Sequence, residues 1–148
     1  MSEVFARGLR SVERQDSVAL VLLRADTADL AALPGLIEAA FPGRLSFTLS
    51  PTGEASVVLP EAELDAGLAA IPASMSIQVS PGLTVIRAAG VCMSAAENKA
   101  RRICADLSRA GIRLHAFSLC DLAVSFTVDA ADADRAFDLV CEAVPLVW

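Results

Sequence analysis

Side chains that could carry out chemistry are few in this sequence and widely spaced. It has four cysteines and one histidine, His115, and no Cys-x-x-Cys pair, so the spacing does not predict a zinc site. Cys104 and Cys141 fall on apolar stripes of predicted helices, where free cysteine packs as a small hydrophobic residue. Cys92 and Cys120 fall at predicted turns, and a thiol-dependent enzyme would need one of them to react unusually fast. No second histidine or paired acid accompanies them.

Carboxylates are more numerous, but their positions favour a structural role. The chain has 18 aspartates and glutamates, and most fall at predicted helix starts and turns, where capping is their usual role. Examples of these capping candidates are Asp26, Asp29, Glu61, Glu63, Asp129, Asp132 and Asp134. The sequence contains no Gly-x-Ser-x-Gly elbow and no Gly-rich phosphate loop. We therefore expect no enzyme, no catalytic residue, no metal and no cofactor.

The charge balance argues against nucleic acid as a partner. The formal net charge is −6, and the arginines are scattered rather than gathered into one stripe. Phosphate backbones demand a positive face. The one basic helix face, formed by Lys99, Arg101, Arg102 and Arg109, is interpreted as a solvated surface. Small acidic or zwitterionic ligands stay compatible with this balance.

The hydrophobic content is high, but its distribution does not predict a membrane protein. Hydrophobic residues make up 55% of the chain, yet the longest strongly apolar run is Val18–Leu23. A helix that spans a bilayer needs about 18 or more such residues. The N-terminus lacks the pattern of a secretion signal, so a cytoplasmic protein is expected. An apolar surplus in such a chain usually lies at a subunit interface, and we expect a homodimer.

Hydrophobic periodicity over residues 83–129 changes from near-continuous to helical and then to alternating, which predicts strand, helix, strand, strand. Ser94 and Glu97 form a capping box that places the helix start just after Ser94. Gly111 stands where a left-handed cap would end that helix. A further helix is predicted from Ala131, and only residues 146–148 are left to supply a last strand. The predicted apolar positions are Ala100, Ile103, Cys104 and Leu107 in the first helix, Ile112, Leu114 and Ala116 in one strand, and Leu122, Val124, Phe126 and Val128 in the other.

The first half of the chain repeats this order. Its predicted elements are a strand at 18–24, a helix at 30–41, a hairpin at 44–59 across Pro51-Thr52-Gly53-Glu54, a helix starting at Pro60, and a strand at 76–79 before the Ser80-Pro81-Gly82 break. Two β-α-β-β-α-β units imply an α+β fold with two ferredoxin-like antiparallel sheets, each with helices on one face. We therefore expect an N-terminal strand and turn segment at 1–16, a first unit at 17–80 and a second at 81–148.

Three motifs in the second unit carry a family resemblance. Gly90-Val91-Cys92-Met93 enters a helix, Ala110-Gly111-Ile112-Arg113-Leu114 follows it, and Ser118-Leu119-Cys120-Asp121-Leu122 leads into a strand. In this order and spacing they resemble the second ACT domain of bacterial aspartokinases. Val4–Leu9, a charged turn and the strand from Val18 resemble the segment that precedes the regulatory pair in that family, so the resemblance covers nearly the whole chain. The kinase half has no counterpart in the sequence, and some bacteria make the regulatory part as a separate small subunit.

The resemblance implies a ligand site at the turn between the first strand and first helix of an ACT unit, beside the second strand of a neighbouring unit. Free N–H groups at the helix start attract a ligand carboxylate, and an acidic side chain can accept its ammonium. The predicted ligand-binding residues are Asp26, Thr27 and Asp29 in the first unit and Met93, Ser94, Asn98, Ser118 and Asp121 in the second. The sequence departs from the family, since Ala31-Ala32 replaces a Pro-Gly after Asp29, and Asn98 replaces a glycine.

Two functions stay open on this basis. The first is a non-catalytic allosteric module that senses a small amino acid, of the lysine or threonine type, at an ACT–ACT interface and acts on a partner kinase subunit. The second is an oligomerisation and interaction module that has lost the amino-acid site. Neither involves nucleic acid or a membrane.

Overall fold

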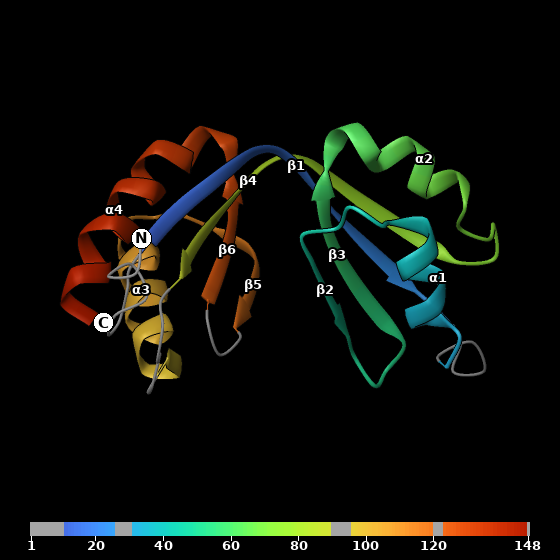
Figure 1. Cartoon of the computed structure of the whole chain (residues 1–148), viewed down its shortest axis with the longest axis horizontal. Coiled ribbons are helices and arrows are strands. Elements are labelled where there is room, and N and C mark those ends of the chain that lie inside the picture. The colour runs from blue at the N-terminus through green and yellow to red at the C-terminus, as the bar shows by residue number, and fades with distance from the viewer. Residues whose placement is uncertain (1–10, 26–30, 90–95, 120–122, 148) are drawn as a thin grey trace, which may run out of the picture. The chain divides into compact units, whose positions relative to one another are not determined.

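The computed structural model describes residues 11–25, 31–89, 96–119 and 123–147. They divide into two compact units, one continuous from Ser17 to Gly82 and one that combines the residues up to Asp16 with those from Leu83 onward (Figure 1). We call them the central unit and the terminal unit. No helix in the described ranges is long and apolar enough to cross a membrane.

The central unit has the strand order β2-β3-β1-β4, which is the order of a ferredoxin-like sheet. It contains α1 (Leu33–Ala40), β2 (Ser46–Leu49), β3 (Glu54–Pro60) and α2 (Leu64–Ala69). It also contains the part of β1 (Ser11–Arg24) from Ser17 onward and the part of β4 (Ser76–Ala89) up to Gly82. The predicted hairpin is confirmed, with β2 antiparallel to β3 and Gly53 at a positive φ of 92° in the turn. The second helix starts later than predicted, because Pro60 has an extended backbone and a 3₁₀ turn, Glu61–Glu63, precedes α2.

Helices α1 and α2 cover one face of the central sheet. Period-two alternation along β1 and β3 directs Val21, Leu23, Val57 and Leu59 to this face, where all four are buried. The helix α1 contributes Leu33 and Ile37, both fully buried, and Phe41 follows it at 0% exposure. The helix predicted at 30–41 is thus confirmed over Leu33–Ala40, and its predicted first residue, Leu30, lies outside the described residues.

The terminal unit has the strand order β1-β4-β6-β5, again ferredoxin-like. Its elements are the start of β1 (Ser11–Asp16), the end of β4 (Leu83–Ala89), α3 (Ala96–Arg109), β5 (Leu114–Leu119), β6 (Ala123–Asp129) and, after a 3₁₀ turn at Ala130–Asp132, α4 (Ala133–Val147). Both β4 and β5 pair antiparallel with β6. The fold class predicted from the sequence, two ferredoxin-like α+β units, is confirmed.

The origin of the fourth strand in the terminal unit corrects the sequence prediction. Residues 146 and 147 belong to helix α4, so the C-terminus does not supply a strand there. The strand is Ser11–Asp16, which was expected to form a charged turn. Its run of Glu, Arg, Gln and Asp resembles a turn in composition, but an edge strand of a sheet tolerates such residues. The break expected at Ser80-Pro81-Gly82 is also absent, since β4 runs through it.

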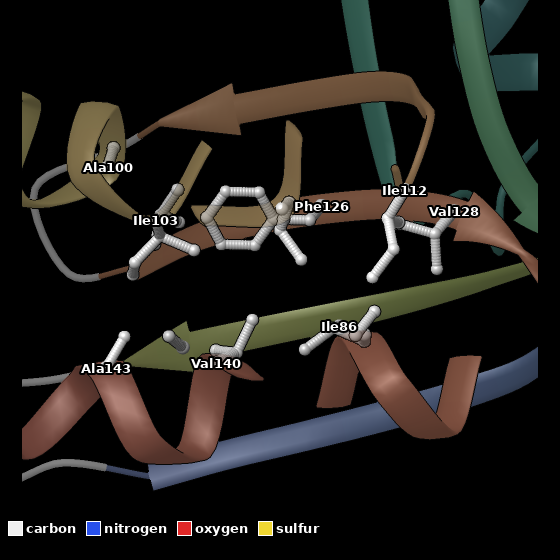
Figure 2. Packing of buried hydrophobic residues seen from close by; sticks show 12 residues of the cluster. Ile86, Ala100, Ile103, Ile112, Phe126, Val128, Val140 and Ala143 are labelled. Atoms are coloured by element: carbon white, nitrogen blue, oxygen red, sulfur yellow. The ribbon is translucent and has the colours of Figure 1, made fainter. Parts of the chain in front are cut away.

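Helices α3 and α4 pack on one face of the terminal sheet. Ile86, Phe126 and Val128 point from the strands toward Ile103 of α3 and Val140 of α4, and all five are at most 1% exposed (Figure 2). The stripe predicted for α3 is confirmed at Ala100, Ile103 and Leu107, with Cys104 partly buried. Gly111 has a φ of 76°, and the Ile112 N–H donates to the Leu107 carbonyl, as in a left-handed helix cap. The capping box at Ser94 lies outside the described residues.

Polar side chains fasten the N-terminal strand to the terminal unit. The Arg14 guanidinium contacts Asp16 at 2.9 Å and Asp134 at 2.7 Å, and it lies 5.8 Å from the centre of the Phe137 ring. The buried Thr84 hydroxyl donates to Asp16 Oδ1 at 2.9 Å. Val12 adds a partly buried apolar contact with the core. A strand distant in sequence thus has specific partners on β4 and α4.

Low pH should weaken the attachment of the N-terminal strand to the terminal unit, because the Asp16 carboxylate becomes protonated. Hydrogen bonds from Arg14 and then Thr84 lower the pKa of the Asp16 carboxyl. A carboxyl with a lowered pKa stabilises the fold above its ordinary value of about 3.9, and this contribution is lost as the pH falls through the folded value. Urea unfolding between about pH 6 and pH 2 should therefore show the stability gap between wild type and Asp16→Asn shrinking toward acid. Glu13→Gln, which changes an exposed carboxylate on the same strand, is the control, and parallel pH profiles for wild type and Asp16→Asn would contradict the prediction.

Candidate ligand-binding site

Most of the predicted ligand-binding residues are not tested by the structure. Asp26, Thr27, Asp29, Met93, Ser94 and Asp121 lie outside the described residues. Asn98 lies in helix α3, but its side chain is outside the described part. Ser118 lies half-buried on β5, opposite Ser125 of β6. These assignments therefore stay predictions.

Two neighbouring hollows lie on the central unit and share Leu22 and Glu54. One encloses about 250 Å³ and the other about 290 Å³. The lining residues are Leu22, Leu23, Arg24, Glu54, Ser76 and Gln78 in the first, and Leu22, Thr48, Leu49, Ser50, Glu54, Ala55 and Ser56 in the second. Together they form one surface, which we call the Arg24–Glu54 site.

The strands position this site through their alternation and register. Val21 and Leu23 point into the core beneath the helices, so Leu22 and Arg24 lie on the opposite face of the sheet. Arg24 ends β1 and Glu54 begins β3, and the antiparallel register places them directly opposite each other. Their side chains form an ion pair on this face. Leu22, which is 40% exposed, supplies an apolar floor beside the charges.

Hydroxyl and amide groups surround the ion pair. Thr48 and Ser56 face each other across β2 and β3, and their hydroxyls are hydrogen-bonded. Ser50 bonds to Thr52 at 2.8 Å in the hairpin turn, and β4 contributes Ser76 and Gln78. The site thus offers a cation, an anion, several neutral hydrogen-bonding groups and a small apolar contact.

This set of groups matches the α-amino and α-carboxylate groups of a free amino acid. A guanidinium binds a carboxylate by paired N–H donors, and a carboxylate accepts from an ammonium. The Arg24 and Glu54 side chains are 71% and 52% exposed, and an ion pair in that setting contributes only about 0–1 kcal/mol. A ligand carrying both charges can therefore replace the pair at little cost.

The described thiols and the histidine do not form a reactive site. Burial raises the pKa of the Cys104 thiol, and burial together with the Asp138 charge raises the pKa of Cys141. A raised pKa disfavours the thiolate that a nucleophilic cysteine needs. His115 Nε2 lies 2.9 Å from Asp129 Oδ1, which makes it a hydrogen-bonded strand residue. Cys92 and Cys120 lie outside the described residues, and within the described part no cluster of His, Cys, Asp and Glu could hold a metal ion.

Sequence reasoning missed Arg24 and Glu54 as binding candidates. Arg24 was the end of a strand and Glu54 a residue of a turn, which are ordinary places for charged side chains. The available signal was their opposite charge at the ends of two strands predicted to share a sheet. It points to a pair only once the register between the strands is known.

Comparison with known proteins shows the fold. No family model and no curated protein matches this sequence. The regulatory subunit of aspartate kinase from Thermus thermophilus, in its ligand-free form, matches 92% of this chain and 95% of its own with a TM-score of 0.72 at 16% identity. The regulatory subunit from Thermus flavus matches 89% of this chain and 95% of its own with a TM-score of 0.71 at 14% identity.

Longer enzymes match over only part of their length. Aspartate kinase from Clostridium acetobutylicum matches 90% of this chain with a TM-score of 0.75 at 14% identity. This chain covers 34% of that enzyme. The fold of this protein is therefore that of the regulatory subunits and regulatory regions of aspartate kinases.

Proposed function

We propose that this chain is a non-catalytic regulatory module that binds a small amino acid, of the lysine or threonine type, where ACT units meet. The observation that carries the proposal is the Arg24–Glu54 pair beside Leu22, which presents both charges and an apolar floor on one open sheet face. The likeness to regulatory subunits that exist as separate chains supports a module without its own kinase half.

The Arg24–Glu54 site is open on one sheet face, so it would bind the amino acid more tightly when a unit from a second chain covers it. We propose a cytoplasmic homodimer, in which the amino acid binds one assembly state better than another. Such a difference in affinity is required before a ligand can shift a population. A partner kinase subunit that prefers one of the states would then respond to the amino acid, and by linkage would change its affinity in return.

A thermal-shift screen of the purified chain against the twenty amino acids tests the proposal. A ligand at a hundred times its dissociation constant stabilises by about 2.7 kcal/mol, which raises the melting temperature by a few degrees. Glu54→Gln keeps the shape of the site but removes the acceptor charge, so the affinity for the stabilising amino acid should fall about tenfold or more. Glu38→Gln, an exposed carboxylate on α1, is the matched control and should leave the affinity unchanged.

The outcomes separate the candidate sites and the alternative function. A selective shift lost in Glu54→Gln supports the Arg24–Glu54 site. A shift lost in Asp29→Ala but kept in Glu54→Gln would move the site to the predicted turn at 26–29. No shift with any amino acid, together with a dimer on a sizing column, would favour the ligand-free oligomerisation module.

A further inference from the structure

The chain passes between its two units twice, and each passage contains one residue with a left-handed backbone. Because the central unit is continuous, the passages lie after Asp16 on β1 and after Gly82 on β4, two neighbouring strands. Ser17 has a φ of 56° and Gly82 a φ of 73°. Among the residues that the structure describes, Ser17 is the one non-glycine with a positive φ. A left-handed serine is unusual inside a strand and indicates local backbone strain.

The residues next to each passage are held inside their own unit. On the terminal side, Asp16 accepts hydrogen bonds from Arg14 and from Thr84. On the central side, the Gly82 N–H donates to Glu61 Oε1 at 2.7 Å, and the fully buried Val18 pairs with Pro60. Residues on both sides of the two passages thus have specific partners within their own unit.

Neither passage residue is enclosed by side chains, although the Gly82 N–H is hydrogen-bonded to Glu61. Ser17 and Gly82 are both exposed, and a Cβ added at Gly82 would meet nothing within 4 Å. Hinges are a few residues that absorb a large change in φ and ψ between rigid segments, and these two positions fit that description.

We propose that Ser17 and Gly82 form a paired hinge, at which the central and terminal units move as separate bodies. Because both passages connect the same two units, rotation at one requires rotation at the other, so the motion is concerted. The hinge is a property of the chain itself and does not depend on the proposed amino-acid ligand.

Amide ¹⁵N relaxation measured on the full chain without ligand tests the hinge. Amides around Ser17 and Gly82 should show conformational exchange, and the two groups should share one exchange rate. Gly82→Ala disfavours the left-handed backbone and should shift the exchanging populations about five- to thirtyfold away from the present conformer. Ser17→Gly relieves the strain of the same backbone and should shift them in the opposite direction.

Gly111→Ala is the matched control. Gly111 has a φ of 76° with nothing within 4 Å of an added Cβ, so its substitution carries the same backbone penalty at a place outside the passages. Exchange at residues 17 and 82 should be unchanged in this variant. Three results would overturn the hinge. The first is an equal population shift in Gly82→Ala and Gly111→Ala, and the second is a different exchange rate at each passage. The third is flat relaxation dispersion together with one rotational correlation time for both units. Should Gly82→Ala fail to fold, Ser17→Gly alone decides the direction of the shift.

Discussion

Replacing Phe126 by alanine should lower the free energy of unfolding of the terminal unit by about 3 to 5 kcal/mol. Phe126 is at 0% exposure in the middle of β6, and its ring lies between the strands and both helices (Figure 2). Close-packed interiors relax only partly around a deleted ring, so the loss combines transfer of the ring with the cavity that it leaves. Hydrogen exchange of the β4 and β6 amides measures this loss unit by unit, since a single transition is not guaranteed in a chain of two units.

Phe117→Ala is the matched control for this prediction. The two phenylalanines are neighbours across β5 and β6, with ring centres 5.8 Å apart, but Phe117 is 42% exposed. Fully burying a phenylalanine is worth about 1.5 to 3 kcal/mol, so removing this half-exposed ring should cost less than about 2 kcal/mol. Equal losses for the two variants would mean that Phe126 does not hold the core position described.

The buried strands and helix stripes could be read from the sequence because their periodicity is local. Alternation around Phe126 and the three-and-four spacing around Ile103 each report which side of one element is apolar. Both were confirmed. Gly111 was confirmed as a helix cap for the same reason, since the left-handed position depends on the residues next to it.

Local periodicity could not predict the N-terminal strand or the elements that it contacts. Its residues are mostly polar, so no alternation marks Ser11–Asp16 as a strand. Its contacts, Asp16 with Thr84 and Arg14 with Asp134, join residues far apart in the sequence. The unbroken β4 was missed for a related reason, because Pro81-Gly82 is usually a turn and here lies inside a strand with Gly82 at positive φ.

The candidate site was only partly accessible from the sequence. Family resemblance directs attention to the turns after the first strand of each unit, and those residues lie largely outside the described structure. The Arg24–Glu54 pair depends on the register of β1 with β3, and a shift by one residue would place these side chains on the core face. Site geometry of this kind follows from pairing between strands rather than from either strand alone.

The substitution Gly67→Ala, which adds one methyl group, should destabilise the central unit by about 1 to 3 kcal/mol. Gly67 is buried in α2, and an alanine Cβ there would lie 2.2 Å from Phe41 Cε1 and 2.9 Å from the Ala40 carbonyl oxygen. Phe41 is at 0% exposure within the core cluster, so its ring can yield only by displacing the residues packed against it. This overpacking exceeds the gain of up to about 1 kcal/mol that alanine brings to a helix over glycine.

Gly35→Ala separates the packing effect from the helix effect. Gly35 lies exposed in α1, and an added Cβ would meet nothing within 4 Å, so this substitution should raise stability by about 0.5 to 1 kcal/mol. Urea unfolding of both variants and of Gly67→Ala combined with Phe41→Leu measures the coupling. Since a leucine occupies less of the space that the new methyl needs, the double variant should be more stable than the sum of the two single changes. A stabilising Gly67→Ala would contradict the packing of α2 against Phe41.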